Sequence, residues 1–418
     1  MTADATVPSR RQLAAVWVLR IAVGAVFVVS GISKIIDPYG TLYKMEQYFA
    51  AWHLNVPYGV TLLGGCLLSL VEFITGWLLA TGSMRRASVG AACAIMAVMT
   101  PLSLYIAIAN PVDHCGCFGD LWVIGNTWTF VKNLVITAAL VPLWRMNAKA
   151  PYLFHPLSQW LQILIAAAYA CIVGLTGYHE QPLIDFRPYP AGTPLVADTD
   201  LSAAQYRYRN TSTGAERIFT ADALPDETDG WEFVERIDNA TSNSSSTFTL
   251  TDDEGHDVTD MLGATHRQLL VLIPDLQSAG LSSTYIINEL AEAITASHGD
   301  DAMLCAVAGD DETVNRWLDL SRPVYPVVRA EATAMRTVAR GSVAVVCLTD
   351  GVVTWKRNIN SINLDRLDGE HTDWDAYSTN EAGQFATLTW TALLLEALLC
   401  LISYTSRLIH TFLTKSAK

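Results

Sequence analysis

The chain has 418 residues, of which 51% are hydrophobic and only 16% are charged. It is therefore too apolar for an ordinary soluble enzyme and too long for one small domain. The formal net charge is −14, and 34 of the 41 acidic residues lie between Glu180 and Glu381. This charge argues against a nucleic-acid partner and favours a membrane part joined to one acidic part outside the membrane.

Six apolar runs are long enough to cross a bilayer, which takes about 20 residues in a helix. The first run ends in Ser33-Lys34 without a small-residue cleavage pattern, so we expect it to be retained rather than removed as a signal peptide. The sequence predicts six spans, at Leu13 to Ile36, Tyr58 to Thr81, Ala87 to Ala109, Thr127 to Trp144, Trp160 to Tyr178 and Ala386 to Tyr404.

Four groups of basic residues flank these runs, and all four fall on one face of the membrane. Cytoplasmic loops are rich in Lys and Arg, so the pattern orients the protein. It predicts a multi-pass protein of a bacterial inner (plasma) membrane, surrounded by lipid, with both termini cytoplasmic and residues 180–381 periplasmic. The residues that carry this prediction are Arg10, Arg11, Arg85, Arg86, Arg145, Lys149, Arg407, Lys415 and Lys418.

The acidic segment begins with a linker and three short β-like runs, at Ala204 to Asn210, Glu216 to Thr220 and Trp231 to Ile237. From Phe248 the pattern predicts strand, helix, strand, helix and a closing hairpin. The predicted elements are Leu269 to Ile273, Ser282 to Ser297, Ala302 to Ala308, Asp311 to Leu320, Val343 to Leu348 and Val352 to Lys356.

This order resembles the thioredoxin fold as TlpA-like and peroxiredoxin-like proteins use it. The place of the thioredoxin Cys-x-x-Cys is held by Pro274 to Gly280, which contains no cysteine, and Val343 stands where the cis-proline is expected. Cys305 and Cys347 lie within apolar strands, which is typical of buried, inert thiols. The segment is interpreted as a degenerate thioredoxin-like domain that binds or positions a protein partner.

Two cysteines stand one residue apart in the outward loop between the third and fourth runs. A disulfide between Cys115 and Cys117 would close a very small ring, and strained bridges have more oxidising potentials, which suits exchange. Gly116 permits the backbone angles that such a ring needs. The membrane surface gives access to a periplasmic thiol and to a lipid-soluble quinone, as in DsbB-like and VKOR-like enzymes. Those enzymes have two cysteine pairs, whereas Cys66, Cys93, Cys171 and Cys400 all fall inside the spans here.

Other interpretations of the loop stay open. The cysteines can form a structural disulfide or remain free thiols. A third alternative is copper or zinc bound by His114, Cys115, Cys117 and Asp113 or Asp120, although the cluster lacks a second ligand pair at a usual spacing. We therefore predict no metal site.

Charged residues inside the spans are costly and are by default functional. Arg20 and Glu72 lie at similar depths if counted from the cytoplasmic ends of their helices, which predicts an ion pair that Glu396 can join. Lys132, beside Asn133, is the lysine predicted to stabilise a thiolate or an anionic quinol. For Lys34 we expect a side chain that reaches out to the interface, and Asp37 and Asp120 are expected to cap helices.

The motifs also resemble known membrane families. The stretch from Trp17 to Gly40 looks like the first helix of the DoxX family, and Cys115 to Gly119 with Phe130-Val-Lys132-Asn133 looks like MauE, the methylamine-utilisation membrane protein. The whole layout resembles uncharacterised DoxX-type proteins from Bacteroidetes. The resemblance implies help in the maturation of a disulfide-rich periplasmic protein beside a thioredoxin-like partner.

The predicted fold is thus an α-helical membrane protein, a four-helix DoxX/MauE-like bundle with two further spans, carrying an α/β thioredoxin-like domain outside the membrane. The expected parts are 1–150 (bundle), 151–180 (fifth span), 181–246 (linker and small β region), 247–382 (thioredoxin-like domain) and 383–418 (sixth span and tail).

Two functions follow from this layout. The first is periplasmic thiol–disulfide chemistry, or maturation of a periplasmic protein, with Cys115 and Cys117 as the exchanging pair, Lys132 tuning them and a quinone as the candidate cofactor. The alternative is a non-catalytic scaffold or assembly factor whose loop disulfide is structural and whose outer domain binds a protein partner.

Overall fold

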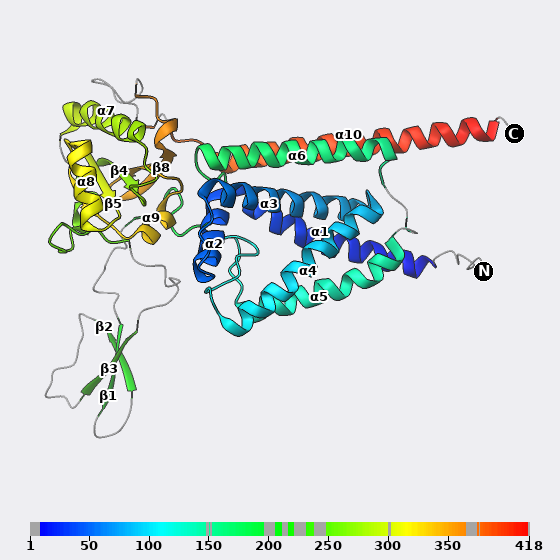
Figure 1. Ribbon diagram of the computed structural model, residues 1–418, viewed down its shortest axis with the longest axis horizontal. Helices are drawn as coiled ribbons and strands as arrows, with labels where there is room; N and C mark the ends of the chain where they lie inside the picture. Colours follow the sequence, from blue (N-terminus) through cyan, green and yellow to red (C-terminus); the bar gives the residue numbers. More distant parts are fainter. Residues whose placement is uncertain are drawn as a thin grey trace. The chain divides into compact units, whose positions relative to one another are not determined.

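The computed structural model describes residues 9–147, 150, 153–195, 205–210, 216–220, 231–237, 248–299, 302–364, 374–375 and 377–416. The chain divides into two compact units. One comprises Met1–Phe186 with Thr379–Lys418, and the other is Arg187–Ser378. Each unit is described by itself (Figure 1).

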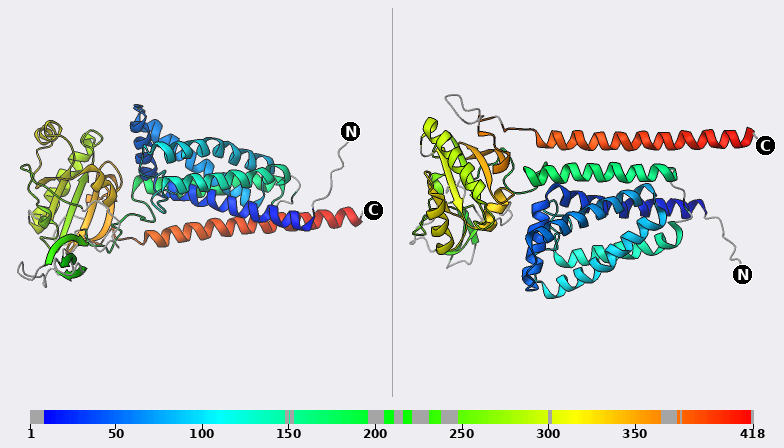
Figure 2. Two further views of the ribbon diagram at one scale, coloured as in Figure 1. Left: turned by 90° about the horizontal axis from the view of Figure 1, so that it is seen from below. Right: turned by 45° about the horizontal axis from the view of Figure 1, so that its top comes forward.

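The first unit is a bundle of long apolar helices that run along one another (Figures 1 and 2). Six of its helices are long and apolar enough to cross a membrane, as the sequence predicts. In each case the helix in the structure contains the predicted run or matches it. These helices are α1 (Arg10–Ile36), α3 (Tyr58–Thr81), α4 (Arg85–Ala109), α5 (Asn126–Met146), α6 (Pro156–His179) and α10 (Glu381–Ser416).

A further helix, α2 (Pro38–Ala51), was not predicted. Asp37 caps it, because the Asp37 side chain accepts a hydrogen bond from the Gly40 amide at 2.8 Å. Pro38 occupies the first helical position, where its missing N–H costs nothing. The expected capping role of Asp37 is confirmed, and α2 joins the C-terminal end of α1 to the loop before α3.

Helices α1 and α3 pack closely because glycines face each other across the contact. A methyl group built on Gly31 would lie 2.5 Å from the backbone nitrogen of Phe73, and one on Gly76 would lie 2.6 Å from the nitrogen of Val28. Small residues allow this approach, which gives membrane helices their van der Waals contact. The contact also fixes the register between α1 and α3, because it places Gly31 against Phe73, the residue after Glu72.

Replacing Gly31 by Ala is expected to lower the thermal unfolding temperature of the detergent-solubilised protein, because the new methyl group meets backbone rather than a movable side chain. Gly90→Ala in α4 is the matched control, since its methyl group would meet nothing closer than Trp144 at 3.9 Å. Ala also has the higher helix propensity, so Gly90→Ala should keep or raise the unfolding temperature. Equal destabilisation by both changes would contradict this account of the contact.

Three arginines bind backbone or side-chain oxygens of the α5–α6 connection. Arg85 donates to the Ala150 carbonyl at 2.7 Å, and Arg407 donates to the Leu153 carbonyl at 3.0 Å. Arg20 donates to the side chain and backbone oxygens of Asn147. The α3–α4 and α5–α6 connections therefore meet at one end of the bundle, and the loop between α4 and α5 lies at the opposite one.

The second unit contains a mixed five-stranded sheet of order β6-β5-β4-β7-β8. Strands β4 and β5 are parallel, whereas β7 is antiparallel to both β4 and β8. The predicted strand, helix, strand, helix and hairpin are all present, and β6 and α9 are additional. The bounds are β4 (Arg267–Ile273), α7 (Leu281–His298), β5 (Met303–Val307), α8 (Asp311–Ser321), β6 (Val327–Arg329), α9 (Ala332–Val338), β7 (Ala344–Thr349) and β8 (Val352–Asn358).

Alternate side chains of β4 serve two hydrophobic cores, as the period of a strand requires. Leu269 and Val271 pack with residues of α7 and α8 on one face, while Leu270 and Leu272 pack with α9 on the other. Cys305 and Cys347, 0% and 1% exposed, lie in the first of these cores, and burial raises the pKa of both thiols. Their predicted burial is confirmed.

A small separate sheet has the order β2-β1-β3 with antiparallel pairing. Its strands are β1 (Gln205–Asn210), β2 (Glu216–Thr220) and β3 (Trp231–Ile237), which coincide with the three predicted runs apart from Ala204. Ala204 lies outside the described residues, as do Lys149 and Lys418 of the predicted basic pattern.

Candidate functional site

The loop between α4 and α5 is held by side-chain hydrogen bonds at its two ends. Asn110, in the left-handed conformation, ends α4. The Asn126 side-chain nitrogen, at the start of α5, donates to the Asn110 side-chain oxygen at 2.6 Å and to the Val112 carbonyl at 2.9 Å. Asp120, predicted to cap a helix, is not the cap of α5, because that helix begins after Gly125.

Within this loop the backbone turns at Gly116, which has a φ of +71°. A side chain there would be strained, and its first carbon would lie 2.7 Å from Cγ of Lys44 in α2. Tyr48 of α2 donates its hydroxyl hydrogen to the Cys115 carbonyl at 2.9 Å. Helix α2 therefore supports the loop directly, which the sequence did not indicate.

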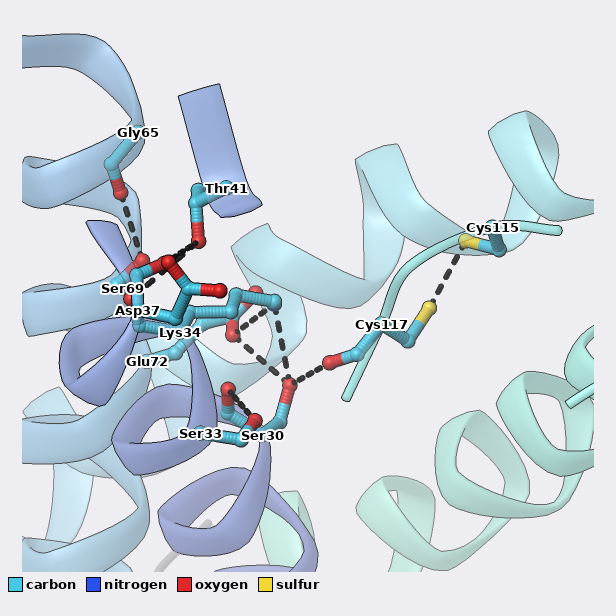
Figure 3. Close-up of polar contacts among 10 residues, drawn as sticks. All are labelled: Ser30, Ser33, Lys34, Asp37, Thr41, Gly65, Ser69, Glu72, Cys115 and Cys117. Atoms are coloured by element: carbon cyan, nitrogen blue, oxygen red, sulfur yellow. Dashed lines mark hydrogen bonds and ion pairs between the residues drawn. The ribbon is translucent and has the colours of Figure 1, made fainter. Parts of the chain in front are cut away.

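The two cysteines face each other as free thiols, with their Sγ atoms 2.9 Å apart (Figure 3). The Cys115 side chain is buried, and Cys117 is partly exposed. A hydrogen bond from the Cys115 thiol lowers the pKa of Cys117 to about 6 against the effect of burial, and the charges of Lys132 and Lys34 act in the same direction. The same hydrogen bond raises the pKa of Cys115. Cys117 is therefore the more acidic thiol of the pair, and Cys115 is the hydrogen-bond donor.

Lys132 lies on the second turn of α5 with its ammonium group 4.4 Å from the centre of the Phe118 ring. This cation–π contact holds the charge beside the cysteine loop. The neighbouring Asn133 turns the other way, into the bundle, and donates to the Ser103 hydroxyl at 3.1 Å. The structure thus places Lys132 beside the cysteine loop, and its predicted role in stabilising a thiolate or an anionic quinol stays a prediction.

Lys34 forms a buried ion pair with Glu72, with Nζ and Oε2 2.6 Å apart (Figure 3). Lys34 is 8% exposed and Glu72 is 3% exposed. The prediction that Lys34 reaches out to the interface is therefore wrong. The physical reason is that α2 covers the C-terminal end of α1. Lys34 is therefore shielded from water and pairs with Glu72 inside the bundle.

Ser30 links this ion pair to the cysteine loop. It lies one turn before Lys34 on α1, and its Oγ accepts from Lys34 Nζ at 3.2 Å. The same hydroxyl lies 2.7 Å from the Cys117 carbonyl oxygen, to which it donates, and 3.0 Å from Glu72 Oε2 (Figure 3). Ser30, Lys34, Glu72 and Cys117 thus form one hydrogen-bonded network. Sequence reasoning missed Ser30, although its i,i+4 spacing from Lys34 puts both on one helix face.

The predicted ion pair between Arg20 and Glu72 is wrong. Arg20 lies beside Gly82, ten residues beyond Glu72 on α3, a distance of about 15 Å along the helix axis. The prediction compared the depths of Arg20 and Glu72 by counting residues from the start of one helix and from the end of the other. Those two helix ends do not lie at the same depth. Glu396 of α10 is 6% exposed and lies beside Trp77. Arg20, Glu72 and Glu396 therefore have three different neighbours, which are Asn147, Lys34 and Trp77 respectively.

His114 also lines this region, and burial lowers its pKa. Across the part of the chain that the structure describes, no group of three or more His, Cys, Asp or Glu side chains is arranged to hold a metal ion. The candidate site at this end of the bundle therefore consists of the thiol pair and the charged side chains beside it, Lys132, Lys34 and Glu72.

Six helices among the described residues are long and apolar enough to cross a membrane, and they define a multi-pass membrane protein. Residues 12–145, which span α1 to α5, match the family described as methylamine utilisation protein MauE. The matched region contains both cysteines, Lys34, Glu72 and Lys132, and it fits a MauE-like membrane protein. No curated protein and no solved structure matches the chain.

Proposed function

We propose that this protein performs thiol–disulfide exchange through Cys115 and Cys117 at the outer face of a bacterial inner membrane, in the maturation of an extracytoplasmic protein. The observation that carries the proposal is the pair of thiols 2.9 Å apart beside two lysines. A lowered thiol pKa beside positive charges is typical of exchanging cysteines. The match to the MauE family over residues 12–145 supports a role in protein maturation.

The orientation of the site follows from the distribution of charge. Arg85 and Arg407 lie at the end of the bundle opposite the cysteine loop, with the start of α1. Basic loops stay on the cytoplasmic side. We therefore assign both termini to the cytoplasm and the loop to the periplasm, where a cysteine pair can be oxidised.

The exchange step conserves atoms and electrons. With Cys115 and Cys117 joined as a disulfide, a thiolate of the partner attacks one sulfur, and the S–S bond breaks as a mixed disulfide forms. Cys117 is the better leaving group because its thiolate is the more stable one. The second partner thiol then displaces Cys115, so the partner becomes the disulfide and this protein the dithiol.

The five-stranded sheet of the second unit supports a thioredoxin-like domain. Two parallel strands followed by an antiparallel hairpin, in the order β5-β4-β7-β8, agree with that fold. The loop from Pro274 to Gly280 lies between β4 and α7 and has no cysteine. We assign the domain a role in binding the protein partner, and Cys115 and Cys117 the redox chemistry.

The test replaces Cys115 and Cys117 by Ser in the full-length protein, and it follows extracytoplasmic thiols by differential alkylation and mass spectrometry. We expect at least one extracytoplasmic protein to accumulate in its reduced form in this variant. Cys66→Ser is the matched control, because Cys66 lies on a membrane span away from the loop. An unchanged redox state of every detected protein would refute the exchange function.

The absence of a cysteine from the loop of the sheet domain also favours a second function, that of a non-catalytic assembly factor. In that case the Cys115→Ser, Cys117→Ser variant would keep full activity in maturation. Changes in the sheet domain would abolish activity instead. The maturation activity of the Cys115→Ser, Cys117→Ser variant therefore separates the two functions.

A further inference from the structure

A cavity of about 290 Å³ lies directly against the cysteine pair. Cys115 and Cys117 form part of its wall together with Lys34, Glu72 and Lys132. The rest of the wall is largely apolar and comes from helices α1 to α5. Its larger apolar residues are Phe27, Phe49, Trp52, Met96, Met99 and Leu102. A mostly apolar pocket with a few converging polar groups is the usual form of a small-molecule site.

The size and the rim of the cavity indicate what it can take. Its volume is close to the lower limit of about 300 Å³ for ligand sites, which suits one ring system rather than a whole lipid. Val98 on α4 lines the cavity and is 64% exposed, and Trp52 lines it and is 37% exposed. Because α4 is a membrane span, the side chain of Val98 faces lipid. The cavity therefore opens toward the hydrocarbon, and a lipid-soluble ligand can enter it sideways.

The cysteine pair also needs an electron acceptor. A thiol pair that oxidises its partner must be reoxidised, and a second cysteine pair is the usual protein acceptor. The chain has 8 cysteines. Apart from Cys115 and Cys117, four lie on the spans and two are buried in the sheet. The chain thus has no second exchanging pair, and the electrons need another acceptor beside Cys117.

We propose that this cavity binds a lipid-soluble quinone that accepts two electrons from Cys115 and Cys117. This inference rests on the proposed exchange function and names its electron acceptor. The S–S bond forms as the two thiols lose two electrons and two protons. The quinone gains two electrons and two protons and leaves as the quinol. No further oxidant or reductant is needed for this step.

The charges on the wall suit this reaction. As a quinone is reduced, negative charge develops on its carbonyl oxygens, and fixed positive groups stabilise that charge. Lys132 and Lys34 both line the cavity and supply ammonium groups. Glu72 and Ser30 hold Lys34 in place. We assign Lys132 and Lys34 to the quinone oxygens and the apolar wall to the quinone ring.

The experiment uses the purified, reduced full-length protein in lipid nanodiscs without oxygen. A decyl-substituted benzoquinone is added, and the formation of the Cys115–Cys117 disulfide is followed by alkylation and mass spectrometry, which also separates a disulfide from a quinone adduct. Oxidised glutathione serves as a water-soluble oxidant in parallel. Met99→Trp fills the cavity, and Ile108→Trp, at a lipid-facing position of α4 that is 77% exposed, is the matched control.

We expect the quinone to oxidise the wild type and Ile108→Trp at the same rate, and Met99→Trp at least tenfold more slowly. Oxidised glutathione should oxidise all three alike, which shows that the thiols of Met99→Trp stay reactive, and an unchanged thermal unfolding temperature of Met99→Trp shows that it is folded. If the quinone oxidises Met99→Trp as fast as the wild type, or fails on the wild type while glutathione succeeds, the quinone proposal is refuted and the exchange function stands. If neither oxidant forms the disulfide, both proposals fall.

Discussion

At pH 7, the Cys115→Ser variant is expected to react with iodoacetamide at Cys117 at least ten times faster than the Cys117→Ser variant reacts at Cys115. Only the thiolate reacts, and the pKa of Cys117 lies near 6 because Cys115, Lys132 and Lys34 favour its charge. The serine hydroxyl in Cys115→Ser can replace the thiol as hydrogen-bond donor. Burial keeps the pKa of Cys115 high in Cys117→Ser. A thiolate of low pKa is intrinsically less nucleophilic, which offsets part of the difference in thiolate fraction.

The pH dependence provides the control for this prediction. Alkylation of Cys117 in the Cys115→Ser variant should fall to half its maximum rate below the usual thiol pKa of about 8.5. Adding Lys132→Met should move that midpoint to higher pH and slow the reaction at pH 7, with little effect at pH 10. Val131→Met, which changes the lipid-facing neighbour, should leave the midpoint where it is. Equal rates for the two serine variants at pH 7 would contradict the assignment of Cys117 as the thiolate.

The membrane helices could be predicted from the sequence because a span depends on a local property, the mean hydropathy of about 20 residues. The strands of the second unit were predicted for a similar reason, since β4 and β7 each contain a short run of apolar residues, Leu269 to Ile273 and Ala344 to Leu348. Helix α2 was missed because its composition is mixed and only Asp37-Pro38 marks its start. Its position over the C-terminal end of α1 depends on tertiary contacts, which a local sequence pattern does not reveal.

The same distinction between local properties and tertiary contacts explains which parts of the candidate site could be predicted. Cys115 and Cys117 were found because they are neighbours in the chain. Lys34 and Glu72 are 38 residues apart, and their pairing depends on the register between α1 and α3. That register is fixed where Gly31 meets Phe73. An estimate of depth from helix ends has an error of several residues, and an error of one turn is enough to choose a different partner.

Breaking the Lys34–Glu72 ion pair is expected to give the largest loss of stability of any change at the site. Glu72→Gln would leave the Lys34 ammonium buried without its counter-charge, which costs about 3–5 kcal/mol in the interior of a protein. Thermal unfolding of the detergent-solubilised protein should show this as a large fall in the unfolding temperature. The Ser30 contact to the Cys117 carbonyl should weaken as well, because Ser30 also contacts Lys34.

The double variant Lys34→Met, Glu72→Met tests whether the loss comes from an uncompensated charge. Two apolar side chains of similar length remove both charges together, and such replacements are often neutral or stabilising. We expect the double variant to recover most of the unfolding temperature that Glu72→Gln loses. Cys117 would nonetheless lose the charge of Lys34, which lowers its pKa more than the charge of Glu72 raises it, so its alkylation at pH 7 should slow. A double variant as unstable as Glu72→Gln would show that packing, rather than charge pairing, holds α1 against α3. Restored stability together with slower alkylation would assign Lys34 a chemical role beside the cysteines, separate from its part in the fold.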